Sequence, residues 1–218
     1  MGVLAPGGIY IQNAATSAFD RYTIATQTVT PGAALACGPL SAASTLADGT
    51  AIGSRANGQI VKFDATTGAC QTLFTAPEWI DALAVSPNGT IVGQSHAATA
   101  GARQIYRFSI SGTVVSKVPL NGVAVLGGIA YSAEGKLYAS AFAAPGDGRW
   151  YSLFADSGLV VLISGSNQLA ASDVCIDSNG FAFGHSGSLV YAYNAATGGL
   201  LGSVDTMRDL SGSALACR

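Results

Sequence analysis

The sequence of 218 residues predicts an all-β chain that forms a single domain of repeated four-stranded antiparallel sheets. Tight-turn signals recur at regular intervals, and short apolar stretches flank each turn. Charged residues make up 10% of the chain, against about 25% in an ordinary soluble domain. Gly, Ala, Ser and Thr are abundant instead. This composition is typical of a rigid, strand-rich surface protein.

Four segments share an apolar stretch, a turn that ends in glycine and a second apolar stretch. They read STLADGTAIGS, LAVSPNGTIVGQ, IAYSAEGKLYAS and VCIDSNGFAFGH, and their glycines are Gly49, Gly89, Gly135 and Gly180. Asp-Gly and Asn-Gly turns supply the positive φ angles that a tight hairpin demands. Each segment is therefore predicted to form two antiparallel strands.

Two further strands follow each hairpin. The third strands are IVKF, IYRF, WYSL and VYAY, and a polar turn leads from each to a fourth, such as CQTLF, TVVSKV, LVVLI and LLGSV. The four-stranded unit recurs about every 40 to 46 residues, a period that indicates a repeat architecture. A fifth unit is split across the ends of the chain: SGSALAC supplies its first strand, and GGIYIQN, FDRYTI and TQTVT supply the others.

These repeats resemble a five-bladed β-propeller whose ring is closed by pairing of the C-terminal strand with the N-terminal strands. The expected blades are residues 209–218 plus 1–36, 37–80, 81–123, 124–168 and 169–208. Across the whole chain the pattern is similar to the loose group of NHL-, YVTN- and tachylectin-like propellers. No subfamily signature is complete, so the resemblance implies the fold and little else.

Alignment of the blades on the hairpin glycine separates packing positions from candidate surface positions. Three residues beyond it an apolar column is expected to pack between blades: Ile11, Ile52, Val92, Tyr138 and Phe183. Five residues before it a column of small residues is expected near the ring axis: Ser44, Ala84, Ala130, Cys175 and Ala216. Cys217 falls in the next position, beside apolar residues.

The four cysteines are expected to be free thiols. Cys37, Cys70, Cys175 and Cys217 lie far apart without a CxxC pair, which disfavours a zinc site. Cys217 ends an innermost strand, whereas Cys37 lies in the link that enters the next one, so these two are expected at opposite faces. A disulfide stays open as the alternative.

Five residues beyond the glycine the column is polar, with Asn13, Ser54, Gln94, Ser140 and His185. These residues end the second strands, at the face where the links between blades emerge. We expect them to be ligand-binding candidates arranged around an axial funnel. The alternative is that ends of strands are polar because they contact solvent.

The links PEWIDA, NGVAVLGG, SNQLAASD and MRDLSGS are expected at the same face. They bring Glu78, Trp79, Asp81, Asp173, Arg208 and Asp209 there, and the first four join the ligand-binding candidates. An exposed Trp79 could stack on a sugar ring or anchor a protein partner; the alternative is a core tryptophan between blades. The insertion APGDGRW, which carries Trp150, is interpreted as an ordinary turn.

Catalysis is not expected. Propellers of this general look include lactonases and streptogramin lyases, which hold a divalent metal or use a His and a Glu at the axis. Here His185 belongs to the polar column and His96 is expected on a loop, so no acid, base and orienting group converge. Oxygen atoms of Glu78, Asp81 and Asp173 would suit Ca²⁺, but the contiguous Asp-x-Asp-x-Asp-Gly loop is missing, so no cofactor is predicted.

Charge and hydropathy restrict the partners. Ten basic and twelve acidic residues give a net charge of -2, and no basic run favours nucleic-acid binding. No apolar run reaches the roughly 18 residues of a membrane helix, and the first residues lack the pattern of a signal peptide.

We therefore expect a non-catalytic recognition or assembly module on an outer surface, as a docking component of a virus particle or of a cell-surface appendage. Its partner would be a protein of a larger assembly. The alternatives are a glycan-binding, lectin-type propeller and a metal-dependent lactonase or lyase.

Overall fold

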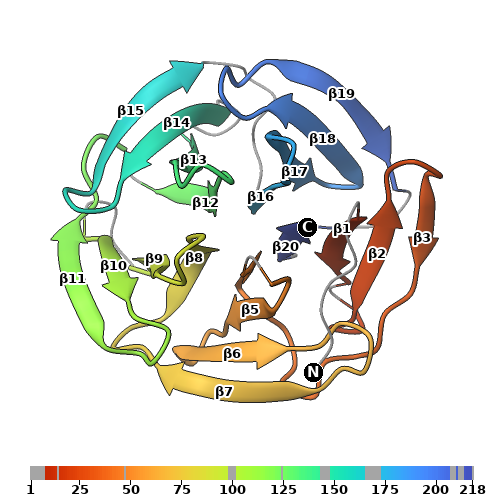
Figure 1. The fold of residues 1–218 in the computed structure, drawn as a ribbon, viewed down its shortest axis with the longest axis horizontal. Helices are drawn as coiled ribbons and strands as arrows, with labels where there is room; N and C mark the ends of the chain where they lie inside the picture. The colour runs from red at the N-terminus through yellow and green to blue at the C-terminus, as the bar shows by residue number, and fades with distance from the viewer. Residues whose placement is uncertain are drawn as a thin grey trace.

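The computed structural model describes residues 8–13, 15–46, 48–97, 102–123, 125–142, 148–164, 173–206, 210 and 214–217. Within these ranges, twenty strands form five four-stranded antiparallel sheets. The sheets are arranged as blades around a central axis (Figure 1). The predicted five-bladed propeller is confirmed. No helix of the described part is long and apolar enough to cross a membrane.

Each blade is numbered here from its innermost strand outward. The split blade contains β20 (Leu215–Cys217), β1 (Gly8–Gln12), β2 (Phe19–Thr23) and β3 (Thr28–Thr30). The second contains β4 (Ala42–Thr45), β5 (Ala51–Ser54), β6 (Gln59–Phe63) and β7 (Cys70–Thr75), and the third β8 (Ile80–Val85), β9 (Ile91–Ser95), β10 (Gln104–Phe108) and β11 (Val114–Pro119). The fourth contains β12 (Leu126–Tyr131), β13 (Leu137–Phe142), β14 (Gly148–Phe154) and β15 (Leu159–Ser164), and the fifth β16 (Val174–Ile176), β17 (Phe181–Ser186), β18 (Leu189–Asn194) and β19 (Leu200–Asp205).

The ring closes as predicted. Strand β20 lies beside β1 near the axis (Figure 1), and the two pair antiparallel with Ile9 opposite Cys217, Tyr10 opposite Ala216 and Ile11 opposite Leu215. Only these three residue pairs join the C-terminal strand to its blade.

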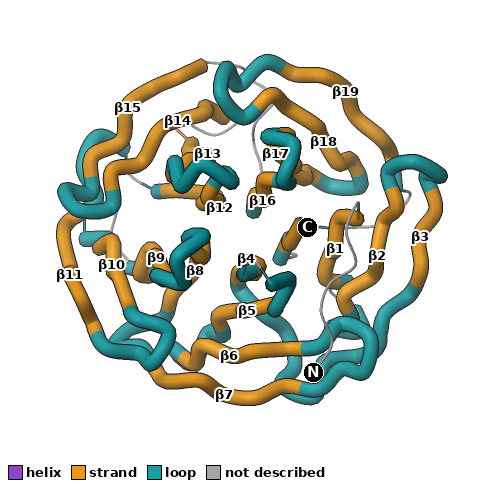
Figure 2. The backbone as a smooth tube through the Cα atoms, viewed as in Figure 1, coloured by secondary structure: helices purple, strands orange, loops and turns teal. Residues whose placement is uncertain are grey.

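The propeller has two faces. We call the face at which the interblade links enter the innermost strands the link face, and the opposite one the hairpin face. At the hairpin face the turns between first and second strands gather around the axis, as the loops between β4 and β5, β8 and β9, β12 and β13, and β16 and β17 show in Figure 2. Site residues can therefore be assigned to a face from their place in the strands.

The core lies between neighbouring blades. One cluster joins Val92 and Ile105 of the third blade to Ile129 and Tyr151 of the fourth. The predicted apolar column is buried, but the register places Tyr10 in it, so the alignment of the split blade was one residue out at Ile11. Its reason is that Gly8 lies in strand β1 and does not close a hairpin.

Trp150 belongs to strand β14, and its interpretation as part of an ordinary turn is wrong. Its side chain is fully buried, its indole N–H donates a 2.7 Å hydrogen bond to the Ala195 carbonyl, and its ring stacks on Tyr138. Residues 143–147 of the same insertion lie outside the described residues. Trp150 is thus a core residue between the fourth and fifth blades.

Two disulfides replace the four predicted free thiols. Cys37 bonds to Cys70 and Cys175 bonds to Cys217, with Cα–Cα distances of 5.8 and 5.5 Å. Cys175 and Cys217 lie on the innermost strands β16 and β20, whereas Cys37 lies in a link beside the start of β7. The prediction was wrong because strand columns compare blades and do not show which residues meet across two of them. Two disulfides indicate an oxidising environment.

Candidate functional site

The predicted polar column is buried beneath the link face. Because Tyr10 pairs with Ala216, the residue of the split blade in this column is Gln12, and Asn13 lies one position beyond it. The Asn13 side-chain oxygen accepts hydrogen bonds from two backbone N–H groups of the following turn. The buried members are Gln12, Ser54, Gln94, Ser140 and His185. The expectation of an open polar funnel therefore does not agree with their burial.

Two of these side chains fasten their blade to the next. Gln12 Oε1 accepts a 3.0 Å hydrogen bond from the Leu40 backbone N–H, and Gln94 Oε1 accepts one of 2.8 Å from that of Leu126. Ser140 Oγ accepts a backbone N–H within its own sheet. Buried polar groups need such partners, because an unpaired one costs about 1–3 kcal/mol. These contacts make the column a joint between blades.

Trp79 lies half-buried at the link face, within a polar cluster. Its indole N–H donates a 2.9 Å hydrogen bond to Ser41 Oγ, and its ring stacks on the His96 imidazole with centroids 3.8 Å apart. His96 Nδ1 lies 3.1 Å from Asp81 Oδ2, and Arg103 pairs with the same oxygen. One face of the indole is therefore covered, and Asp81 is bound by neighbouring side chains.

Glu78 belongs to a second cluster. Its Oε1 accepts hydrogen bonds of 2.8 Å from Lys117 Nζ and 2.5 Å from the Tyr106 hydroxyl. The hydrogen bond from Lys117, followed by that from Tyr106, lowers the pKa of the Glu78 carboxyl below its ordinary value. Lys117 also lies over the Tyr106 ring, 5.0 Å from its centroid. Glu78 is a carboxylate held in place by the third blade.

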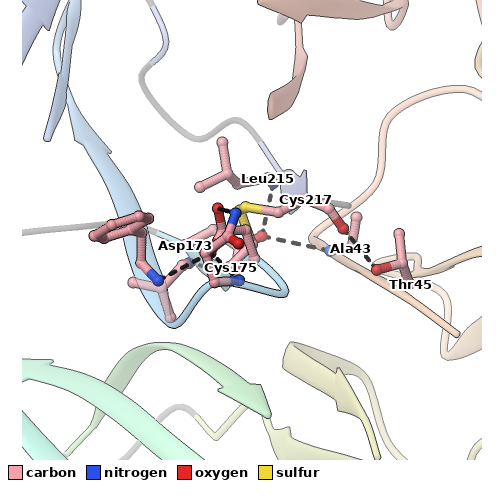
Figure 3. The surroundings of a disulfide bond; sticks show 10 residues. Ala43, Thr45, Asp173, Cys175, Leu215 and Cys217 are labelled. Atoms are coloured by element: carbon pink, nitrogen blue, oxygen red, sulfur yellow. Dashed lines mark hydrogen bonds between the residues drawn. A yellow bond between two sulfur atoms is a disulfide. The ribbon is translucent and has the colours of Figure 1, made fainter. Parts of the chain in front are cut away.

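Asp173 is fully buried near the axis, between three innermost strands. Its Oδ1 accepts the Val174 backbone N–H at 2.9 Å, while Oδ2 accepts that of Leu215 at 2.8 Å and that of Ala43 at 3.4 Å (Figure 3). Burial raises the pKa of this carboxyl well above its ordinary value, although the three hydrogen bonds act in the opposite direction. Asp173 therefore joins β16, β20 and β4 at their link-face ends.

The acidic residues considered for Ca²⁺ hold separate sets of partners. Glu78 contacts Lys117 and Tyr106, and Asp173 is enclosed by backbone N–H groups. In the described part of the chain, no group of three or more His, Cys, Asp or Glu side chains is placed to hold a metal ion. Arg208 and Asp209, which were expected at the same face, lie outside the described residues.

The largest cavity opens on the opposite, hairpin face. It has a volume of about 370 Å³ and is lined by all five innermost strands together with three of the first hairpins. The Cys175–Cys217 disulfide forms part of its wall, and Figure 3 shows this bond close to Thr45 and Asp173. The lining is mainly aliphatic, with hydroxyl groups and the side chain of Tyr131. We call it the axial cavity.

Large exposed hydrophobic side chains gather on the outermost strands of the third, fourth and fifth blades. We call them the rim patch: Val114 and Val115 in β11, Leu159, Val161 and Leu162 in β15, and Leu200 and Leu201 in β19. These three strands follow one another around the ring (Figure 1). Strands β3 and β7, which are described in full, add none to this set. The rim is therefore unequal around the ring.

Comparisons with known proteins place the chain by fold alone. It shares 13% identity with a chain of a nidogen/laminin complex, over 97% of this chain and 81% of that one, at a TM-score of 0.63. A gluconolactonase from Xanthomonas campestris gives 15% identity, coverages of 95% and 80%, and a TM-score of 0.59. TolB from Acinetobacter baumannii gives 12%, 97% and 66%, and 0.57. No protein-family model and no curated protein match the chain.

Sequence reasoning missed both the axial cavity and the rim patch. The rim patch had a readable signal, because LVVLI and LLGSV are outermost strands with few polar residues. The disulfide had one as well, since Cys175 and Cys217 occupy adjacent columns on innermost strands. The cavity had no signal in the sequence, because its volume depends on how five strands pack around the axis.

Proposed function

We propose that the protein is a non-catalytic recognition and assembly module of an outer surface, which docks a protein partner through the rim patch. The observation that carries the proposal is the restriction of exposed aliphatic side chains to three consecutive outermost strands. Large apolar patches on a soluble domain mark interaction sites. A structural component of a virus particle or of a cell-surface appendage would use such an unequal edge.

The charge of the rim favours a protein partner. Strands β11, β15 and β19 contain one lysine and one aspartate between them. Lys117 already pairs with Glu78 at 2.8 Å. Nucleic acid and anionic lipid surfaces are bound by clusters of cations, which this patch does not offer. An apolar protein surface is the complementary partner.

The second blade shows how a rim becomes covered. Its Phe74, on the outermost strand β7, packs against Phe108 of the next blade with ring centroids 5.3 Å apart. The exposed residues of β11, β15 and β19 have no such cover within the described chain: Val115 is 59% exposed and Leu201 is 56% exposed. A docked partner would bury these side chains.

The two disulfides support work outside a reducing compartment. Both flank the split blade, the only one whose strands are not continuous in sequence. A ring held in this way would keep its shape during assembly on an outer surface.

Site-specific photo-cross-linking tests the proposal. A photoreactive phenylalanine analogue at position 161 of the rim patch should cross-link one partner protein in an extract of native surface or particle proteins. The same group replacing Gln71, which is exposed on β7, is the matched control. The triple change Val115→Thr, Val161→Thr and Leu201→Thr keeps strand-forming residues but removes apolar area, so it should abolish stoichiometric binding of that partner.

Three outcomes would contradict the proposal. Equal cross-linking from positions 161 and 71 would show that the rim patch is not selective. Cross-linking of position 161 only to a second copy, or binding of the patch to lipid vesicles, would replace the partner by another occupant. Turnover of lactone substrates that the triple variant retains would indicate an enzyme.

A further inference from the structure

The axial cavity is chemically distinct from every site considered so far. Its walls are aliphatic side chains such as Val85, Ala130 and Ile176, with hydroxyl groups of Ser44 and Ser178 between them. No lysine or arginine lines it. A volume of about 370 Å³ falls in the range of small-molecule sites, which combine apolar walls with a few polar groups. The lining therefore suits a small neutral ligand with both apolar and hydroxyl-bearing surfaces.

The one carboxylate in the lining is already satisfied. Asp177 Oδ1 accepts the backbone N–H groups of Asn179 and Phe181 at 2.9 Å each, which holds the hairpin between β16 and β17. A cationic ligand would therefore find a carboxylate whose charge is offset by hydrogen bonds. This further favours a neutral ligand.

Hydroxyl groups remain available for such a ligand. Ser44 Oγ accepts the Val85 backbone N–H at 3.1 Å, which leaves its own O–H free to donate. Burial raises the pKa of the Tyr131 phenol, so this group is a neutral hydroxyl that can donate and accept. The Tyr131 ring adds a partly exposed aromatic surface of the kind that packs against the C–H face of a sugar.

The walls are held rigidly around the axis. Thr45 Oγ1 donates a 2.7 Å hydrogen bond to the Cys217 carbonyl, and the bond between Cys175 and Cys217 ties β16 to β20. At the link-face end, Asp173 joins the same strands to β4. A cavity with walls fixed in this way loses little entropy when it binds a ligand.

A second hollow continues the cavity outward between the hairpins of the third and fourth blades. It has a volume of about 280 Å³, and Ser86, Pro87, Tyr131 and Ala133 line both spaces. Its outer end carries Arg107. The Tyr131 side chain thus stands where a ligand would pass from the axis into the hollow.

We propose that the hairpin face binds a neutral oligosaccharide, with its terminal sugar in the axial cavity and the next sugar in the adjoining hollow beside Tyr131. Aliphatic walls would contact the C–H faces of the sugars, and the serine and tyrosine hydroxyls would bond to their O–H groups. This site lies on a different surface from the rim patch and does not rest on the docking function.

Saturation-transfer NMR and calorimetry test the site. The probes are an array of neutral oligosaccharides, followed by glucose, galactose, mannose, fucose, N-acetylglucosamine and their disaccharides at millimolar concentration. Ala133→Trp fills the opening shared by both spaces from an exposed turn position, so the fold should tolerate it. Ser111→Trp adds the same bulk to an exposed turn between β10 and β11 and is the matched control.

The expected result is saturable binding of at least one probe, with the disaccharide bound more tightly than its terminal sugar alone. Ala133→Trp should abolish it, and Ser111→Trp should leave it unchanged. Tyr131→Phe should weaken it about three- to tenfold, as the loss of one hydrogen bond implies.

Three results would overturn the proposal. Absence of binding across the array and the listed sugars in folded protein is the first. Binding that persists in Ala133→Trp is the second. Binding that Trp79→Ala abolishes while Ala133→Trp leaves it intact would move the sugar site to the link face. Loss of the rim partner would leave all three readouts unaffected.

Discussion

The Cys175–Cys217 disulfide should contribute a large share of the stability of the closed ring. The double change Cys175→Ala and Cys217→Ala removes it without leaving a free thiol. Its cysteines are 42 residues apart, so the loop-entropy relation predicts a loss of about 4 kcal/mol. For a chain of this length such a loss lowers Tm by roughly 8–16 °C.

The second disulfide provides the matched control. Cys37 and Cys70 are 33 residues apart, so loop entropy predicts a nearly equal loss, about 3.7 kcal/mol, for Cys37→Ala with Cys70→Ala. The two pairs differ in position, because only Cys217 lies on the strand that closes the ring. Loss of the first pair should therefore also loosen the pairing of β20 with β1.

Calorimetry and amide hydrogen exchange separate these effects. The Gln12 backbone N–H donates a 2.9 Å hydrogen bond to the Ala214 carbonyl, so it reports on ring closure. Its exchange should accelerate in the Cys175/Cys217 variant and not in the Cys37/Cys70 variant. A change in Tm below about 2 °C in the first variant, or identical Gln12 exchange in both, would refute the reasoning.

Three further predictions concern buried or tightly packed positions. Because burial raises the pKa of the Asp173 carboxyl, its contribution to stability is fully present below the unfolded pKa of about 3.9 and is lost as pH rises through the folded pKa. Wild-type Tm should therefore gain on that of Asp173→Asn as pH falls from neutral, and parallel curves would contradict this. Gly158→Ala should cost more than about 2 kcal/mol in urea denaturation, because its Cβ would lie 2.0 Å from the Pro119 carbonyl oxygen, whereas Gly135→Ala, with a positive φ but open space, should cost about 1 kcal/mol. Trp150→Ala should lower the unfolding free energy by about 3–5 kcal/mol, and a loss below about 1 kcal/mol would show that Trp150 is not a core residue.

Local chemistry explains why most of the fold could be predicted. Gly49, Gly89, Gly135 and Gly180 all have positive φ angles in the structure, as their hairpin turns require. The alignment failed only where this signal was absent, at Gly8 of the split blade, and the failure shifted Ile11 and Asn13 by one residue.

The candidate site was less predictable, because its properties depend on contacts between blades. Polarity placed Gln94 and Ser140 at the ends of strands, but only the packing of neighbouring blades decides that such groups are buried joints. The disulfide partner of Cys175 depends likewise on which two blades meet where the ring closes.

The sequence by itself determined the strands, the fivefold repeat and the closure of the ring, because turn residues and apolar columns act over a few positions. The tertiary structure decided the burial of the polar column, the pairing of the cysteines, the axial cavity and the unequal rim. These features arise where side chains from different blades compete for the same space, and that competition has no local signature in the sequence.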